Sequence, residues 1–209
     1  MKSLARNLGL LLLIVLCTVL VASFGSGSFT VHMIVHMGVV AVAAPLIGYG
    51  MRGTPLDAAP GVARVTPMLA SFIELVAVWF WHLPALRALA DASLALSLLE
   101  QASFLAAGAL LWRACFRPAE GRLAGVAGLL FTSMHMTLLG VLLALAPRAL
   151  YGEGDVSCFG ISLSAAADQQ AGGVIMLAVG AFAYLLGGIV LLAGLLRDGE
   201  ALPTEKPRC

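Results

Sequence analysis

The sequence predicts an all-α membrane protein, a bundle of about six transmembrane helices. Of its 209 residues, 61% are hydrophobic and only 11% are charged, whereas a soluble domain is about half apolar and about a quarter charged. The apolar residues form runs near the length of about 20 that a spanning helix needs, with short polar breaks between them. We therefore expect a single transmembrane helical domain over residues 1–209.

Hydropathy places the helices at about 4–24, 29–50, 62–82, 93–114, 122–146 and 170–196. The breaks agree with this division, because segments 25–28, 52–55 and 117–118 are rich in Gly, Ser or Pro. The longest predicted loop covers about 147–169.

The first apolar run has two interpretations. Lys2 and Arg6 precede it and Ser23 ends it, which also fits a signal peptide with a small-residue cleavage site. The run is long for the apolar core of a signal peptide, so we favour a retained anchor. Either interpretation leaves the second helix starting on the outer side.

Basic residues lie mainly on one side of the predicted bundle. With the N-terminus in the cytoplasm, all of the 12 Lys and Arg except Arg87 and Arg148 fall on the cytoplasmic side. Cytoplasmic loops carry an excess of Lys and Arg. This bias predicts both termini inside and an even number of spans.

All four histidines fall in or near predicted spans. His32 and His36 lie near the outer start of the second helix, His82 at the outer end of the third and His135 near the middle of the fifth. Ionisable residues inside a bilayer are costly and normally face a cavity, a partner or a site. This favours a functional role for His36 and His135. His32 and His82 lie near the interface, where a packing or solvated histidine is equally compatible.

Methionines accompany these histidines. They are Met33 and Met37 on the second helix, Met134 and Met136 on the fifth, and Met176 on the sixth. His32, Met33, His36 and Met37 share an arc of about 140° on one side of the second helix. Imidazole with thioether favours Cu(I), because zinc prefers thiolate, imidazole and carboxylate. For Met134, Met136 and Met176, filling the core or facing lipid is the alternative.

Two carboxylates fall inside predicted spans, Glu74 and Glu100, with no basic residue expected at their depth. Each must be protonated, hydrogen bonded to a histidine whose tautomer it fixes, or part of a proton path. Asp168, Gln169 and Gln170 begin the sixth helix, where they form either a polar cap or a gate to the site.

Several functional classes are not supported. Cys17, Cys115, Cys158 and Cys209 are far apart without a CxxC pair, so we expect neither a zinc site nor a disulfide. The net charge of +1, without a basic stripe, gives no reason to expect nucleic acid. No hydrolytic triad or phosphate loop is visible, so we expect a protein that is not an enzyme.

Six segments together resemble a known family. They are His32-Met33-x-x-His36-Met37, Trp81-His82-Leu83-Pro84, Glu100-Gln-Ala-Ser-Phe104, His135-Met-Thr-Leu-Leu-Gly140, Ala146-Pro147-Arg148-x-Leu-Tyr151 and Asp168-Gln169-Gln170-x-Gly172-Gly173-x-Ile-Met176. Over about residues 29–185 the chain resembles the multi-spanning CtaG family of cytochrome c oxidase assembly factors, associated with caa-type oxidases. It departs from the family at 177–179, where relatives often carry Trp and Pro.

The resemblance implies a bacterial plasma-membrane protein that supplies copper to an oxidase centre. Its partners would be oxidase subunits, with a periplasmic copper chaperone and a second copy of the chain as further hypotheses. Carried over by position, the family's polar motifs fall on His32, Met33, His36, Met37, His82, Glu100, His135, Asp168, Gln169, Gln170 and Met176.

From these residues we expect a Cu(I) site open to the outer face, formed by the second, third and fifth helices. His32, His36 and His135 would be ligands aided by Met33 or Met37, while Glu100 would orient a ligand and His82 would line the entrance. Two alternatives remain open at this point. One is a haem protein with His36 and His135 as axial ligands, and the other is a copper transporter.

Overall fold

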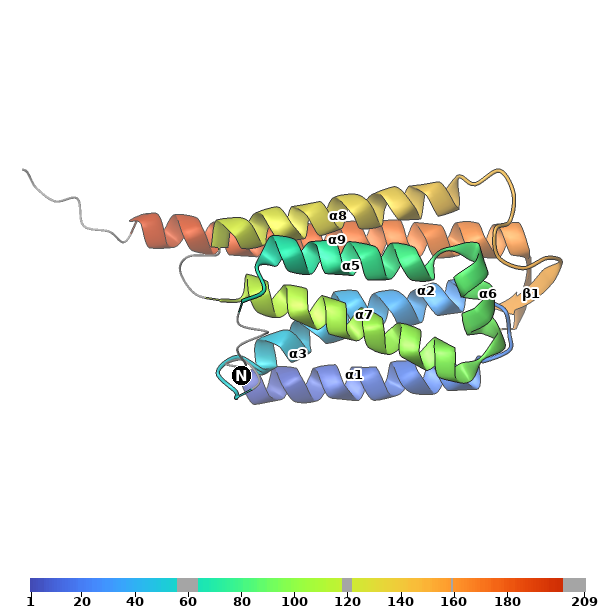
Figure 1. Ribbon diagram of the computed structural model, residues 1–209, viewed down its shortest axis with the longest axis horizontal. Coiled ribbons are helices and arrows are strands. Elements are labelled where there is room, and N and C mark those ends of the chain that lie inside the picture. Colours follow the sequence, from blue (N-terminus) through green and yellow to red (C-terminus); the bar gives the residue numbers. More distant parts are fainter. Residues whose placement is uncertain (56–63, 118–121, 159, 201–209) are drawn as a thin grey trace, which may run out of the picture.

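The structure is a computed structural model that describes residues 1–55, 64–117, 122–158 and 160–200. It is a bundle of roughly parallel and antiparallel helices with a β-hairpin and a short transverse helix at one end (Figure 1). Within the described residues, five helical segments are long and apolar enough to cross a membrane. The predicted all-α membrane bundle is therefore confirmed.

The helices follow the chain in order. They are α1 (Lys2–Ala22), α2 (Phe29–Met37), the π-helical segment η1 (Gly38–Ala43), α3 (Ala44–Gly50), α5 (Pro67–Trp81), α6 (Pro84–Ala92), α7 (Leu94–Cys115), α8 (Arg122–Ala144) and α9 (Ala165–Glu200). Strands β1 (Asp155–Cys158) and β2 (Ile161–Ser164) pair antiparallel, with Val156 opposite Leu163. Helices α2, η1 and α3 together form one span over 29–50.

The helix starts follow from local sequence. The Ser28 hydroxyl accepts a hydrogen bond from the Val31 amide at 3.3 Å and caps α2. The Thr66 hydroxyl accepts one from Leu69 at 3.2 Å and caps α5, whose first residue is Pro67. A hydroxyl cap and an initial proline both favour helix initiation, because the first helical amides have no partner within the helix.

The predicted third helix differs most from the structure. Helix α5 starts at Pro67, five residues after the predicted start, and residues 62–63 lie outside the described chain. It ends at Trp81, and α6 then leaves at a 73° bend. The bend follows from Pro84, because a residue before proline avoids the helical region and Leu83 is extended with ψ 131°. Taken together, the two helices are long and apolar enough to be a broken span or a re-entrant loop.

Two further elements were not predicted. Helix α6 and the β1–β2 hairpin lie in segments that the sequence assigned to loops, and α9 starts at Ala165 rather than near 170. All of these elements lie at the same end of the bundle (Figure 1). They therefore cover this end of the central helices.

Helices α8 and α9 pack closely through glycines. A Cβ added at Gly140 would lie 2.7 Å from the Leu177 nitrogen and 2.9 Å from the Gly173 carbonyl oxygen. Small residues let helix backbones approach in membranes, where close van der Waals packing drives association. This contact fixes the position of α9 against α8.

We expect Gly140→Ala to destabilise the bundle by about 1–3 kcal/mol, because backbone atoms cannot yield to the added methyl group. Thermal unfolding in detergent measures the effect. The matched control is Gly188→Ala on α9, where the nearest atom to an added Cβ is the Leu130 Cδ2 at 3.9 Å. Equal stability of the two variants would contradict the close approach.

Candidate functional site

Three histidines meet near the end of the bundle that carries α6. His32 and His36 are one turn apart on α2, and His82 follows the last residue of α5. The ring centroids are 5.4 Å apart for His36 and His82, 6.0 Å for His32 and His82, and 6.2 Å for His32 and His36. All three side chains are buried, and His36 is completely inaccessible. We call His32, His36 and His82 the histidine cluster.

Several ring nitrogens of the histidine cluster have no partner in the described structure. The His82 Nδ1 lies 2.6 Å from the Val78 carbonyl oxygen. A carbonyl only accepts, so this nitrogen carries the proton and the His82 Nε2 is left with its lone pair. That Nε2 and both His36 nitrogens are buried without a hydrogen-bond partner. The Phe104 ring packs on His36 at 4.1 Å and supplies no polar atom.

Arg87 on α6 reaches the histidine cluster, which corrects the expectation that Glu100 has no basic residue at its depth. Its Nη1 donates to both Glu100 oxygens at 2.8 and 2.6 Å, and its Nη2 donates to Asp91 at 2.6 Å. The same Nη1 lies 2.9 Å from the His32 Nδ1 and 3.3 Å from its Nε2, and the imidazole must accept because a guanidinium only donates. The His32 Nε2 is 3.7 Å from Glu100. Glu100 is thus closer to Arg87, with which it forms hydrogen bonds, than to His32.

Sequence reasoning had placed Arg87 in an outer loop. The signal that could have found it is the pair Arg87 and Asp91, four residues apart, which is typical of a helix. The bend after Trp81 folds this helix across the bundle end, so its arginine points back toward α2 and α7.

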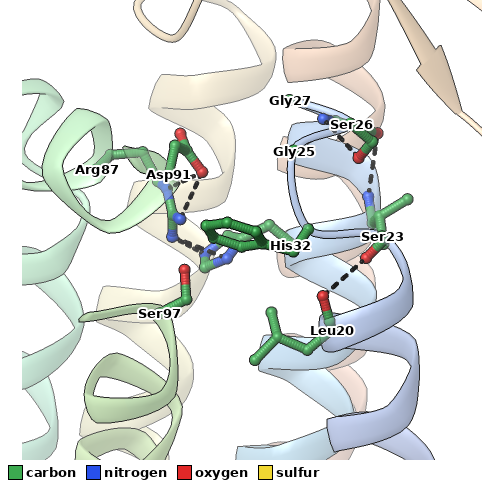
Figure 2. Close-up of a pocket in the computed structure, with 12 residues that line it drawn as sticks. Leu20, Ser23, Gly25, Ser26, Gly27, His32, Arg87, Asp91 and Ser97 are labelled. Carbon is green, nitrogen blue, oxygen red and sulfur yellow. Dashed lines mark hydrogen bonds and ion pairs between the residues drawn. The ribbon is translucent and has the colours of Figure 1, made fainter. Parts of the chain in front are cut away.

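Two cavities reach His32 and Arg87 from the surface. One of about 480 Å³ is bounded by Phe29, Tyr151 and Pro84. The other, of about 120 Å³, lies against the loop after α1, and Figure 2 shows the His32 ring, Arg87 and Asp91 beside it. The Tyr151 ring stacks on Phe29 at 4.4 Å, and its hydroxyl donates to the His82 carbonyl at 2.7 Å. The loop after α8 therefore covers one side of the histidine cluster.

Asp168 caps α2 from another helix. Its carboxylate accepts hydrogen bonds from the Ser28 hydroxyl at 2.9 Å, the Phe29 amide at 2.5 Å and the Thr30 amide at 3.3 Å. A carboxylate at these amides also complements the positive end of the helix. The predicted cap exists, but it serves α2 rather than α9, the helix that contains Asp168.

Gln169 is buried and hydrogen bonded, whereas Gln170 faces outward. The Gln169 Oε1 accepts from the Leu150 amide at 2.6 Å, and its Nε2 donates to the Leu143 carbonyl at 3.1 Å. Gln169 thereby holds the loop after α8, whereas Gln170 is exposed. The geometry gives Asp168 and Gln169 positioning roles next to the site.

The methionines of α2 face α9. A Cβ at Gly172 would lie 3.0 Å from the Met33 Cγ, and one at Gly180 would lie 3.5 Å from the Met37 Cε. Both methionines therefore pack on α9, and Met136 packs beside Met37 at Gly180. At about 100° per residue, the methionine pair is centred about 100° around the helix from the histidine pair.

The remaining two methionines differ in their exposure. Met176 is fully buried in α9, while Met134 is 70% exposed on α8. For Met134 this agrees with the lipid-facing alternative.

His135 lies apart from the histidine cluster. Among the described residues its ring contact is with Phe131 at 5.8 Å, one turn earlier on α8. It borders a groove that it shares with Leu75 and Trp79 of α5. Its two nitrogens are buried without a partner, as in the cluster. The structure thus brings together His32, His36 and His82 but not His135.

The sequence model of the cytochrome c oxidase caa3 assembly factors, Caa3_CtaG, matches residues 4–198. The chain belongs to this family. The resemblance predicted over about 29–185 is therefore confirmed and extends to nearly the whole chain. Comparison with curated proteins and with solved structures gave no match.

The CtaG motifs gather around α2. The histidines of two motifs form the histidine cluster, Glu100 of a third lies beside it, and Tyr151 and Asp168 of two others hold its surroundings. In the remaining motif, His135 lies apart at the groove with Trp79, although Met136 packs near Met37 of α2. In the described part of the chain, no group of three or more His, Cys, Asp or Glu side chains is arranged to hold a metal ion.

A second buried polar group in this CtaG chain lies around Glu74. The Tyr184 hydroxyl donates to the Glu74 Oε1 at 2.7 Å, and the Thr132 hydroxyl lies 3.4 Å from Oε2. Ser71 lies 2.5 Å from the Thr132 hydroxyl. Tyr184 and Thr132 were missed because an isolated Tyr or Thr in an apolar run gives no sequence signal. Hydroxyl partners therefore compensate the burial of Glu74.

The described cysteines form no disulfide. Cys17, Cys115 and Cys158 are free, and Cys209 lies outside the described residues.

Proposed function

We propose that this member of the CtaG family binds Cu(I) at His36 and His82, with His32 as a third ligand, and supplies it to a cytochrome c oxidase. The observation that carries the proposal is the set of buried imidazole nitrogens without partners in the histidine cluster. Copper is cargo in this role, so we propose no catalytic activity.

The unpartnered nitrogens need a compensating interaction. A buried polar atom without a hydrogen bond costs about 1–3 kcal/mol. His36 has two such nitrogens and His82 has one. A metal ion is the partner that matches two lone pairs from neighbouring rings, because imidazole is a common ligand of copper and zinc.

The surroundings favour Cu(I) over zinc. Structural zinc sites are closed by four ligands, often cysteine thiolates, whereas the histidine cluster offers three imidazoles that do not form a ready three-ligand group before His32 moves. Two histidines with a third nearby offer few ligands, which suits an ion that must be released to another protein. The third ligand, His32, requires movement, since its Nδ1 accepts from Arg87 at 2.9 Å.

The cavities and the charge bias support the direction of transfer that we propose. Both cavities at His32 and Arg87 open at the bundle end that carries α6 and the hairpin. The excess of basic residues at the other end supports a cytoplasmic position for that end. We place the protein in a bacterial plasma membrane, with copper entering from a periplasmic chaperone and leaving to an oxidase subunit on the outer side.

The experiment compares the copper content of His36→Ala/His82→Ala with that of His135→Ala. Each protein is loaded anaerobically with Cu(I) in detergent, washed with a Cu(I) chelator and measured by elemental mass spectrometry. We expect the double variant to lose nearly all retained copper and His135→Ala to keep it, because His135 lies outside the histidine cluster.

Other results would redirect the proposal. Full copper retention in the double variant would remove the site from the histidine cluster. Loss of copper in His135→Ala, but not in the double variant, would instead support His135 as a ligand, as the sequence predicts. A Soret band in the purified protein would instead support haem binding. Circular dichroism of each variant checks that the helices remain folded.

A further inference from the structure

A chain of buried hydroxyl groups ends at Glu74, in the middle of α5. The Tyr184 hydroxyl of α9 donates to the Glu74 Oε1 at 2.7 Å, and the Thr132 hydroxyl of α8 lies 3.4 Å from the Oε2. The Ser71 hydroxyl lies 2.5 Å from that of Thr132 and 3.0 Å from the Gly128 carbonyl oxygen. The side chains of Ser71, Glu74, Thr132 and Tyr184 are all inaccessible to solvent. We call these four side chains the glutamate group.

The contacts that lead from the Glu74 Oε2 to Gly128 need three protons. They join Glu74 to Thr132, Thr132 to Ser71, and Ser71 to the Gly128 carbonyl. A hydroxyl supplies one proton and a carbonyl supplies none. If Thr132 gives its proton to Glu74, Ser71 must give its own to Thr132, and the contact with the Gly128 carbonyl is left without a proton. An ionised Glu74 therefore leaves one contact of the chain unfilled.

A protonated Glu74 fills all three contacts. The carboxylic acid then donates from Oε2 to Thr132, Thr132 donates to Ser71, and Ser71 donates to the Gly128 carbonyl. A protonated carboxyl group has one O–H donor and keeps a carbonyl oxygen that accepts. The Oε1 is that acceptor, because the Tyr184 hydroxyl donates to it. Every contact then has one donor and one acceptor.

The surroundings of Glu74 also favour the neutral form. A buried carboxylate is costly unless a cation or strong donors compensate its charge. For Glu100 on α7 the Arg87 guanidinium does so, at 2.8 and 2.6 Å. Among the described residues, the titratable groups that act on Glu74 are Tyr184 and Cys115, which are both neutral when protonated. The two buried carboxyl groups therefore differ in how their burial is compensated.

We propose that Glu74 is a proton-binding site in the interior of the bundle and holds its proton at neutral pH. Release of the proton reverses two hydroxyl groups, because Thr132 must then donate to the carboxylate and Ser71 to Thr132. The site therefore couples the protonation of a residue on α5 to a hydrogen bond with α8. The glutamate group shares no residue with the histidine cluster, so this proposal does not depend on copper binding.

Infrared difference spectroscopy tests the proposal with two matched variants, Glu74→Gln and Glu100→Gln. A carboxylic acid has a carbonyl stretching band that a carboxylate lacks. Subtracting the spectrum of each variant from that of the unsubstituted, copper-free protein at neutral pH isolates the contribution of one carboxyl group.

We expect the acid band in the difference spectrum for Glu74 and its absence in the spectrum for Glu100, which Arg87 holds as an ion. Carboxylate bands without an acid band for Glu74 would overturn the proposal. An acid band of equal size for Glu100 would also overturn it, because burial alone would then explain both.

Tyr184→Phe tests the arrangement of the protonated group. It removes the hydroxyl that donates to Oε1 and keeps the ring. The acid band of Glu74 should move to higher frequency, because its carbonyl oxygen loses a hydrogen bond. An unchanged band would contradict the proposed arrangement.

Circular dichroism identifies any variant that fails to fold. If Glu74→Gln does not fold, unsubstituted protein labelled isotopically at the carboxyl carbon of its glutamates replaces it in the infrared measurement. The acid band must then shift with the label at neutral pH. Absence of a label-sensitive acid band would overturn the proposal without any substitution.

Discussion

Arg87→Leu is expected to destabilise the bundle by about 3–5 kcal/mol, the cost of leaving one member of a buried ion pair alone. The affected group is Glu100, a fully buried carboxylate whose hydrogen bonds come from the Arg87 Nη1 at 2.8 and 2.6 Å. Chemical or thermal unfolding in detergent measures the loss. It should be large compared with the change in Arg148→Leu, which removes the other predicted outer arginine from an exposed position.

A double variant separates pairing from packing. Arg87→Leu/Glu100→Leu removes both charges, so it should recover most of the stability that Arg87→Leu loses. If the double variant is as unstable as the sum of the two single variants, Arg87 and Glu100 do not act as a pair. The single variant also leaves the His32 Nδ1 without the donor that holds it.

Asp168→Ala is expected to destabilise the bundle by about 2–4 kcal/mol, because the Ser28 hydroxyl and the amides of Phe29 and Thr30 lose their acceptor. The same variant should lower copper retention, since His32 and His36 lie in the first turns of the helix that Asp168 caps. Unfolding and copper content are measured on the same preparation.

Two controls accompany this prediction. Gln170→Ala changes the exposed residue two positions away and should have little effect. Asp168→Asn keeps one carbonyl acceptor and should lose less stability than Asp168→Ala. Copper loss in Asp168→Ala without any change in stability would instead assign Asp168 a direct role as a gate.

The sequence alone predicted those features of the fold and the site that depend on the kind of residue at a position and not on how helices pack. Apolar length located the spans, and His32, His36 and His82 were recognised because ionisable residues are rare in such runs. The order of the motifs also identified the family.

The grouping of the site residues could not be predicted, because it depends on how helices bend and rotate. His82 joins the histidine cluster at the end of α5, and the turn that follows at Pro84 brings Arg87 to Glu100. His135 was expected at matching depth, but depth does not fix the rotation of α8, and its ring borders the groove with Trp79. The role of Asp168 was also hidden, because its partners precede it by more than a hundred residues.

The π-helical segment η1 divides the second span into two parts whose side chains follow different helical registers. A π-helical turn holds more residues than an α-helical turn, so positions before Gly38 and after Ala43 follow different rotational phases. A helical wheel drawn continuously over 29–50 therefore assigns one half of the span to the wrong faces. Chimeras that join the part with the histidines to α3 must therefore preserve the length of η1. A relative with one residue fewer in this segment should be aligned separately over the part before η1 and the part after it.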